Sequence, residues 1–480
     1  MWLLGAAILI GSIGRVVYSW SAPLWLDETY SAAIAGQRDW QGLIRWCLYE
    51  LTGPGYYVPL WAWARAAGTS DLALRLPSLV LALATPLLAF RARAWNRDVR
   101  HAWAALIALW LPAYAVAGEA RGYALLLLLG VAQIMLLRRL LVAPSITRAA
   151  AWLAVSGWML LINYWSGIPA LAQGLVYLAV HRRRAIATWP AIVVMVPVAA
   201  WMQWHLPKVI GATMGSIGGG PIHAGLGWGS LLDLPAMLLG TAPLGWGTIG
   251  LVGGSLIVAR RAKPGTAPVT ADADRAVIWA GLLGIALVVA LAIARPGFNA
   301  RYATAAIPGL LFVIACWLAW ARRAVPQAAT LMAALWLASA VGLVAATAVG
   351  PDTDPRHRFQ LETPSTWIGQ AAPDTALILW DGAIASRGDP QRVGEIGGYF
   401  LRRAGAPVRI EVAMPDRLND PNRQITAWLA RHRNGAVLWF ANEEIDAARQ
   451  PRLLAWTAGH ACRDFGGDGV IVFACRPGVR

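Results

Sequence analysis

The chain opens on an apolar run that a pair of acids follows: "WLLGAAILIGSIGRVVYSW" fills residues 2–20 and "SAPLWLDETYSAAI" fills residues 21–34. A helix needs about 20 apolar residues to cross the hydrocarbon of a bilayer. No basic residue precedes the run, Arg15 lies within it, and no clear small-residue cleavage site follows it. These features favour a retained membrane span over a removed signal peptide.

The rest of the chain repeats this pattern. Apolar residues make up 58% of the 480 residues and charged residues only 14%, whereas soluble domains carry about 25% charged residues. The composition excludes an ordinary soluble globule and predicts a polytopic α-helical membrane protein. The eleven spans that we predict lie near residues 2–20, 72–90, 102–118, 122–137, 149–163, 167–180, 186–203, 233–257, 276–294, 303–320 and 327–349.

Basic residues gather in alternate loops, at 91–100, 138–148, 182–184, 260–263 and 322–323. Under the positive-inside rule these loops face the cytoplasm. The prediction is a multi-pass protein of the bacterial inner membrane, with a cytoplasmic amino terminus and a periplasmic carboxyl-terminal domain. The formal net charge of +16 therefore reports orientation and indicates no nucleic-acid partner. The acids that fall on the outer side before residue 350 are Asp27, Glu28, Asp39, Glu50, Asp71, Glu119 and Asp233.

The composition changes near residue 350, which divides a membrane domain, 1–349, from a soluble extracytoplasmic domain, 350–480. In the latter, strand-like runs "TALILW", "VRIEV", "AVLWF" and "GVIVFA" alternate with helical patterns such as "PNRQITAWLARHR". This alternation predicts an α/β domain. Cys462 and Cys475 flank its last piece. An oxidising compartment would permit a disulfide there, but spacing alone leaves a free pair open.

The first outer loop, 21–71, predicts helices that lie in the membrane interface. In "DWQGLIRWCLYE", residues 39–50, apolar side chains recur at helical spacing, which is typical of an interfacial helix. Gly and Pro in "TGPGYY" end that helix, and Tyr57 belongs to an aromatic band suited to lipid headgroups. A later outer segment, 204–232, shows no helical period and is either a loose connector or a lid.

Asp27 and Glu28 allow two interpretations. A half-buried carboxylate at the outer mouth of a bundle can accept a proton from an attacking hydroxyl. Alternatively, "LDET" merely starts a helix with Asp27 as its cap.

Arginines on the outer side also allow two interpretations. "AYAVAGEARGYALLLLLG" holds Glu119 and Arg121, and "IARPGFNARYATAAIPGLL" holds Arg295, Asn299 and Arg301. Arginine on that side opposes the usual bias. Its planar guanidinium suits the phosphate of a lipid-linked donor. The other interpretation is an ion pair, such as Arg121 with Glu119 or Asp27.

These motifs, in this order, resemble the C-type (GT-C) glycosyltransferase superfamily, in the branch of the protein O-mannosyltransferases and the lipid A aminoarabinose transferase. The matching stretches are the first-loop "DE", "GPGYYVPLWAWARAAGTSDLALRLPSLV", "EARGYAL" and "RYATAAIP", within roughly residues 15–320. The resemblance implies a polyprenyl-phosphate sugar donor and an inverting reaction. It also implies that Asp27 is the base with Glu28 beside it, and that Arg121 and Arg301 contact the donor.

The sequence thus predicts a membrane glycosyltransferase for a hexose or pentose, whose acceptor hydroxyl belongs to a glycan, lipid or protein. No metal or other cofactor is expected, because the usual ligand spacings do not occur, although Asp27, Glu28 and Glu119 could converge on a divalent ion. The alternatives are a transporter or flippase of envelope lipids or polysaccharides, and a non-catalytic scaffold. The candidate catalytic residues are Asp27 and Glu28. The candidate substrate-binding residues are Tyr57, Glu119, Arg121, His205, Arg295, Asn299 and Arg301. Among these, His205 fits an interfacial histidine better than a ligand.

Overall fold

The computed structural model describes residues 2–19, 23–213, 228–261, 272–294, 299–349, 360–380, 390–403, 408–413, 421–441, 459–466 and 471–478. Their contacts divide the chain into two compact units. The first, here called the membrane unit, draws on Met1–Ser21, Arg38–Thr213 and His223–Val349. The second, here called the sheet unit, joins Ala22–Gln37 to Gly350–Arg480. The segment that carries Asp27 and Glu28 therefore groups with residues beyond 350.

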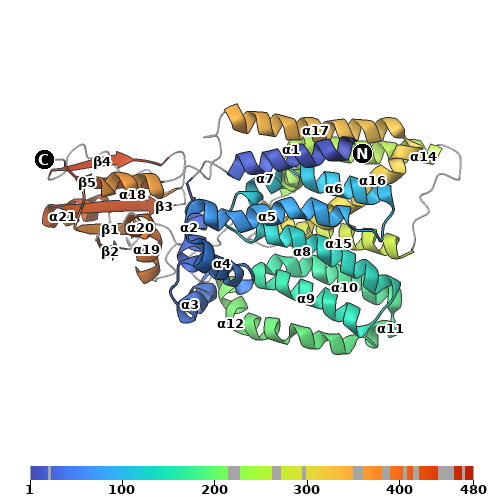
Figure 1. Cartoon of the computed structure of the whole chain (residues 1–480), viewed down its shortest axis with the longest axis horizontal. Coiled ribbons are helices and arrows are strands. Elements are labelled where there is room, and N and C mark those ends of the chain that lie inside the picture. Colours follow the sequence, from blue (N-terminus) through green and yellow to red (C-terminus); the bar gives the residue numbers. More distant parts are fainter. Residues whose placement is uncertain are drawn as a thin grey trace. The chain divides into compact units, whose positions relative to one another are not determined.

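The membrane unit is built of helices, and Figure 1 shows the longer ones side by side. Their bounds are α1 (Trp2–Ser19), α3 (Trp40–Tyr49), α4 (Pro54–Ala67), α5 (Asp71–Phe90), α6 (Arg97–Leu109), α7 (Pro112–Ala117), α8 (Tyr123–Val142), α9 (Ile146–Ile162), η1 (Tyr164–Ser166), α10 (Gly167–His181), α11 (Arg183–Ile186), η2 (Trp189–Met195), α12 (Val196–Thr213), η3 (Trp228–Leu232), α13 (Leu234–Leu239), α14 (Ala242–Arg261), α15 (Asp272–Ala294), η4 (Ala300–Ala305), α16 (Ile307–Ala324) and α17 (Pro326–Val349).

The helical, polytopic architecture is confirmed, but the predicted count of eleven spans is not. Within the described ranges, 6 helices are long and apolar enough to cross a membrane: Asp71–Phe90, Tyr123–Val142, Trp189–Gly211, Asp272–Ala294, Ile307–Ala324 and Pro326–Val349. A pair bent by 94°, Ser230–Leu239 with Ala242–Val258, makes 7 if it counts as one span. Trp2–Val17 and Ile146–Ile162 are apolar but shorter. The predicted span 102–118 is divided between α6 and α7, because Pro112 has no backbone N–H with which to continue α6.

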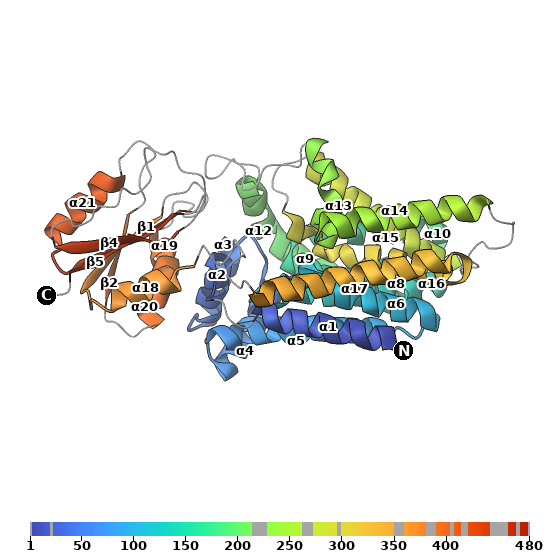
Figure 2. The same ribbon diagram turned by 90° about the horizontal axis from the view of Figure 1, so that it is seen from above.

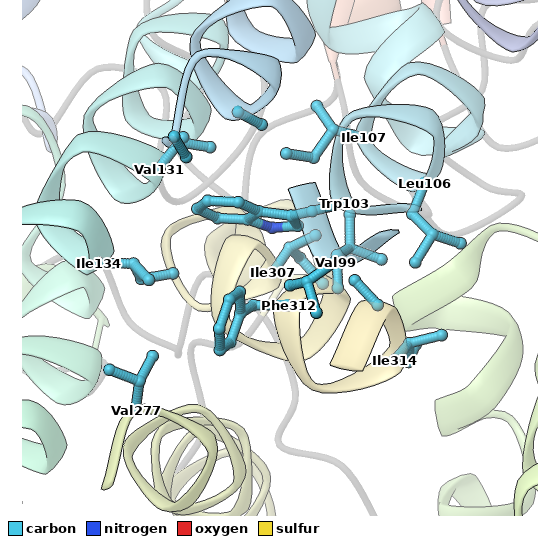
Figure 3. Close-up of a cluster of buried hydrophobic side chains, with 14 of the residues drawn as sticks. Val99, Trp103, Leu106, Ile107, Val131, Ile134, Val277, Ile307, Phe312 and Ile314 are labelled. Carbon is cyan, nitrogen blue, oxygen red and sulfur yellow. The ribbon is translucent and has the colours of Figure 1, made fainter. Parts of the chain in front are cut away.

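Aromatic packing joins the helices of the membrane unit. Trp103 of α6 lies edge-on to Phe312 of α16 at 5.3 Å between ring centroids, as the close-up in Figure 3 shows. The indole N–H of Trp103 donates to the carbonyl of Pro308 at 3.1 Å. Both side chains are fully buried, so this contact combines apolar burial with a satisfied polar atom.

Arg15 explains how the broken span is stabilised. This residue of α1 is fully buried, and its guanidinium donates to the carbonyls of Ala108 at 2.9 Å and Ile107 at 2.7 Å. Those carbonyls lie at the end of α6, where a helix leaves its last C=O groups unpaired. Arg15 therefore caps α6 from a neighbouring helix.

Replacement of Arg15 is expected to destabilise the fold. In Arg15→Met the two carbonyls lose their donor inside the bundle, which costs about 1–3 kcal/mol for each group left unsatisfied. The measurement is thermal unfolding of purified protein in detergent, with Arg15→Lys as the matched variant that keeps one donor group. A melting temperature of Arg15→Met equal to that of the wild type would contradict this assignment.

Ion pairs join loops that the charge pattern predicts on one face. Asp98 lies 3.3 Å from Arg322 and 3.2 Å from Arg323, and Arg138 lies 2.7 Å from Asp274. These residues belong to different predicted cytoplasmic loops, and their contacts bring those loops to one end of the membrane unit. The side of the membrane to which that end belongs stays a prediction.

The segments that the charge pattern predicts on the outer side contain more helix than predicted. α3 ends at Tyr49, before "TGPGYY", and that stretch instead begins α4, because Pro54 suits the first turn of a helix. A Cβ on Gly53 would lie 2.3 Å from the carbonyl oxygen of Leu161, so glycine there lets α4 approach α9 closely. The prediction that 204–232 lacks helix is wrong for residues 204–213, which belong to α12, and for 228–232, which form η3; residues 214–227 lie outside the described ranges.

The sheet unit contains the predicted α/β domain. Its strands are β1 (Thr375–Trp380), β2 (Arg409–Ala413), β3 (Gly435–Ala441), β4 (His460–Asp464) and β5 (Ile471–Pro477). They lie in the order β2-β1-β3-β5-β4, with β1 parallel to β2 and β3, and β5 antiparallel to β3 and β4. Its helices are α2 (Leu26–Ala35), α18 (Glu362–Gly369), α19 (Pro390–Gly397), α20 (Tyr399–Arg403) and α21 (Pro421–Arg431). Figure 2 shows α21 on one side of the strands and α18 with α20 on the other.

The two cysteines of the sheet unit form a disulfide. Cys462 of β4 lies directly opposite Cys475 of β5 in the antiparallel ladder, and the two are bonded. The open question of pairing is therefore settled by the register of two neighbouring strands, which sequence spacing does not reveal.

Candidate active site

The centre of the candidate site in the membrane unit is the amino-terminal end of α8. Arg121 precedes the cap residue of this helix, Gly122, and Tyr123 is the first helical residue. Between α7 and α8 the chain makes a tight turn in which the Arg121 N–H donates to the Glu119 carbonyl at 2.7 Å. Glu119 and Arg121 are both buried. A helix amino terminus carries partial positive charge, so this end of α8 favours an anion.

Arg121 is held in place by the segment around "TGPGYY". Its Nη1 donates to the Tyr57 hydroxyl at 3.0 Å and lies 3.7 Å from Oε1 of Glu50. The Thr52 hydroxyl donates to the same Tyr57 oxygen at 3.1 Å. Arg121 thus has an ion-pair partner, Glu50, that the sequence argument did not consider. The planar, charged guanidinium of a buried arginine is a group type that suits a phosphate.

A second arginine reaches the same helix end. Arg301 belongs to η4, where its backbone N–H donates to the side-chain oxygen of Asn299 at 3.2 Å. Its guanidinium carbon lies 5.6 Å from the ring centroid of Tyr123, at cation–π distance. Arg121 therefore directly precedes the cap residue of α8, and Arg301 packs on the first residue of that helix. Their roles as donor contacts stay a prediction. Asn299 supports the turn that holds Arg301.

His205 is fully buried in the structure; its interpretation as an interfacial histidine stays a prediction. Its Nε2 lies 2.6 Å from the backbone carbonyl of Glu50, and its Nδ1 lies 2.6 Å from the Tyr164 hydroxyl. A carbonyl only accepts, so Nε2 carries the hydrogen and, in the neutral ring, Tyr164 donates to Nδ1. Burial raises the pKa of Tyr164 to about 12, opposed by a hydrogen bond with Trp201, so the hydroxyl stays protonated at neutral pH. His205 thereby ties α12 to the residue that pairs with Arg121.

Loss of the His205 contacts is expected to weaken, without removing, the binding of the phosphate donor that the sequence resemblance implies. In His205→Ala the Glu50 carbonyl loses its donor, and we expect the donor KM to rise about 10-fold, as for the loss of a hydrogen bond of 1–1.5 kcal/mol. Steady-state kinetics with a range of donor concentrations measures this. Tyr164→Phe, which removes only the contact to Nδ1, should show a smaller rise in the same direction. A donor KM unchanged in both variants would contradict the role.

Asp27 and Glu28 lie in the first turn of α2, in the sheet unit. A helix does start here, as one of the two interpretations predicts, but its cap residue is Trp25 and not Asp27. It is Glu28 whose Oε2 accepts from the Trp25 N–H at 3.4 Å. Glu28 is buried, whereas Asp27 is half-buried. The two neighbours therefore differ: Glu28 has a structural contact at the helix start, and Asp27 has the partial exposure that a proton acceptor needs.

One candidate residue is not described by the structure, and several residues of the site were not identified from the sequence. Arg295 lies outside the described residues. Sequence reasoning missed the contacts of Glu50, Thr52 and Tyr164. Glu50 was identified only as one of the acids predicted on the outer side. In the part of the chain that the structure describes, no group of three or more His, Cys, Asp or Glu side chains could hold a metal ion.

Comparison with known proteins supports the fold assignment. No family model matches the chain, and no curated protein matches it by sequence. A crystal structure of ArnT from Cupriavidus metallidurans in the apo state covers 98% of this chain and 98% of its own, at 15% identity and a TM-score of 0.58. The chain has the ArnT fold. A second crystal structure of that ArnT, bound to undecaprenyl phosphate, covers 98% of this chain and 97% of its own, at 15% identity and a TM-score of 0.56.

The resemblance that the sequence motifs suggest is therefore confirmed as a resemblance of fold. The ArnT fold also extends beyond the residues that suggested it. The motifs lie within roughly 15–320, whereas the structural match covers 98% of the chain and so takes in the sheet unit.

Proposed function

We propose that this protein is a glycosyltransferase of the bacterial inner membrane, which moves a sugar from a polyprenyl-phosphate donor to an acceptor hydroxyl on the periplasmic face. The observation that carries the proposal is the convergence of Arg121 and Arg301 on the amino-terminal end of α8. Two guanidinium groups at a helix amino terminus suit a phosphate. The ArnT fold supports the same donor class, since one ArnT structure contains undecaprenyl phosphate.

In the proposed reaction the arginines act on the leaving group. The bond between the anomeric carbon and the phosphate oxygen breaks, and both of its electrons stay with the polyprenyl phosphate. Negative charge therefore grows on a phosphate that Arg121 and Arg301 contact, and a preorganised cation stabilises that charge more in the transition state than in the bound donor. Phosphate leaves as a stable anion, so no general acid is required.

The acceptor side of the reaction needs one base. Asp27 accepts the proton of the acceptor hydroxyl as its oxygen forms the new bond to the anomeric carbon from the face opposite the phosphate. Attack from that face inverts the anomeric configuration. A single carboxylate suffices here, unlike inverting hydrolases, in which a second carboxyl group must protonate the departing sugar oxygen. The half-buried position of Asp27 suits this task better than that of the buried Glu28.

The proposed reaction uses no metal, since the arginines already supply the positive charge that the leaving phosphate needs. We expect that prolonged treatment with a divalent-metal chelator changes the transfer rate by less than about twofold, because a lost Lewis acid would cost several kcal/mol of transition-state stabilisation. The rate is measured before treatment, after it, and after Mg²⁺, Mn²⁺ or Zn²⁺ is added back. A loss that one of these ions restores would contradict this expectation.

The test of the proposed function is a panel of polyprenyl-phosphate hexoses and pentoses offered to membranes that contain the protein. The expected result is transfer of one sugar to an endogenous acceptor, with an anomeric configuration opposite to that of the donor. Membranes without the protein are the control. No transfer from any donor, in the presence of folded protein that binds polyprenyl phosphate, would contradict the proposal.

A transporter or flippase is the second candidate function, because one observation favours it. The helix pair Ser230–Leu239 and Ala242–Val258 is bent by 94°, and broken helices around a central site are typical of transporters. The two functions differ in the fate of the donor: a flippase leaves the bond between sugar and phosphate intact, and a transferase breaks it.

A further inference from the structure

The helix that carries Asp27 is too short to be stable by itself. α2 contains 10 residues, and isolated helices shorter than about 12–15 residues are marginal in water. Its position must therefore come from the residues that pack against it. Within the sheet unit, three contacts tie α2 to the chain beyond residue 350, one before the helix, one in its middle and one after it.

The first contact lies at the start of α2. Trp25, the residue before the helix, forms an antiparallel β-bridge with Gln360. Leu361, the next residue, is fully buried and precedes α18. The bridge fixes the backbone two residues before Asp27, so it sets where the first turn of α2 begins.

The second contact lies in the middle of α2. The ring of Tyr30 lies 6.1 Å from that of Trp380, the last residue of β1. Trp380 is itself buried and packs on Phe440 of the neighbouring strand at 4.7 Å. Tyr30 follows Asp27 by three residues, which places both on neighbouring positions of one helix face. The central strands of the sheet therefore fix the rotation of α2 about its own axis.

The third contact lies after α2. The Gln37 side-chain amide donates to the carbonyl of Ala33 at 2.9 Å and to Oε2 of Glu395 at 3.5 Å. Glu395 belongs to α19, and its other oxygen accepts from Gln391 of the same helix at 3.0 Å. One side chain thus caps the last turn of α2 and links it to α19.

We propose that the soluble domain beyond residue 350 positions the base of the reaction, with Tyr30, Gln37, Trp380 and Glu395 as positioning residues for Asp27. This inference rests on the proposed function, because it assumes that Asp27 accepts the proton. The soluble domain then contributes to the chemical step and not to donor binding, since the arginines that contact the donor belong to the membrane unit.

Kinetics of paired variants test the proposal. In Tyr30→Leu and Trp380→Leu the aromatic contact is lost and α2 can shift, and displacement of a reacting group by about 1 Å can cost roughly 100-fold in rate. We expect kcat per folded protein to fall roughly 10- to 100-fold, with an unchanged donor KM. The matched control is Trp439→Leu, which removes an equally buried tryptophan from β3 that packs with Phe473, in the cluster that includes α21. Its kcat per folded protein should stay close to that of the wild type.

A cross-linking experiment keeps the proposal testable if Trp380→Leu folds poorly. Gln37→Cys with Glu395→Cys, in a chain whose Cys47 and Cys316 are replaced by alanine, should be joined in membranes by a short thiol-reactive linker. The control pair is Gln37→Cys with Glu411→Cys, because Glu411 faces α21, where it accepts from the Trp428 indole at 3.0 Å. This control pair should not be joined.

The possible outcomes separate the two proposals. A wild-type kcat in Tyr30→Leu and Trp380→Leu, alongside loss of transfer in Asp27→Asn, would overturn the positioning role and leave the proposed function standing. Failure of the Gln37–Glu395 pair to cross-link would also overturn it. A wild-type kcat in Asp27→Asn would instead overturn the role of Asp27 as the base, and with it the basis of this inference, while sugar transfer itself would stand.

Discussion

The Asp27→Asn variant is expected to lose roughly 10²–10⁴-fold in kcat, the usual contribution of a positioned general base, while its affinity for the donor stays within a few-fold of the wild type. Asparagine has nearly the same shape as aspartate but cannot accept the proton of the acceptor hydroxyl. Single-turnover transfer gives the rate of the chemical step, and binding of a labelled polyprenyl phosphate gives the affinity. Equal protein levels in membranes establish that the variant folds.

Glu28→Gln is the matched variant for this experiment. Glu28 accepts a backbone hydrogen bond at the start of α2, and the amide oxygen of glutamine can still accept it. We therefore expect a far smaller loss of kcat than in Asp27→Asn. A loss in Glu28→Gln as large as the predicted loss in Asp27→Asn, with Asp27→Asn near the wild type, would move the base to Glu28 and contradict the assignment.

The second large effect is expected in Arg121→Gln. Glutamine carries no charge, so the growing negative charge on the leaving phosphate loses one of two cations, and removal of such a group costs roughly 10²–10³-fold in kcat. Donor affinity should fall as well, because in the proposed reaction the same guanidinium contacts the phosphate of the bound donor. Donor binding and single-turnover transfer, measured on the same preparation, separate the two effects.

The control for Arg121→Gln concerns its ion-pair partner. Glu50 lies 3.7 Å from Arg121, and an ion whose partner is removed destabilises its surroundings. In the double variant Arg121→Gln with Glu50→Gln no charge is left uncompensated, so general damage to the fold should be relieved. If the double variant binds donor and transfers sugar like the wild type, Arg121 has only a structural role. Persistent loss supports the phosphate contact.

The sequence predicted the helical architecture because apolar runs of span length have few other uses. α5, α8, α15, α16 and α17 lie where such runs occur. The number of spans was harder to predict, since it depends on where a run breaks. Pro112 marks one break in the sequence, but the cap that Arg15 gives α6 depends on packing between helices.

The candidate site was predictable in its residue types and not in its contacts. Arg121 and Arg301 stood out because arginine opposes the usual charge bias on the outer side. Their convergence on one helix end, and the chain of contacts from Tyr164 through His205 to Glu50, join residues far apart in sequence. A sequence pattern does not reveal which of these distant residues are in contact. The same holds for α2, whose partners in the sheet unit follow it by more than 300 residues.

The most direct test of the proposed function follows both halves of a donor labelled in its sugar and in its lipid. Purified protein is placed in vesicles with an acceptor-containing membrane extract, and one turnover is recorded. The prediction is that sugar label appears on the acceptor at the same rate as free polyprenyl phosphate is released, and that Asp27→Asn produces neither. Donor that crosses the bilayer with its sugar still attached, and no free polyprenyl phosphate, would contradict it.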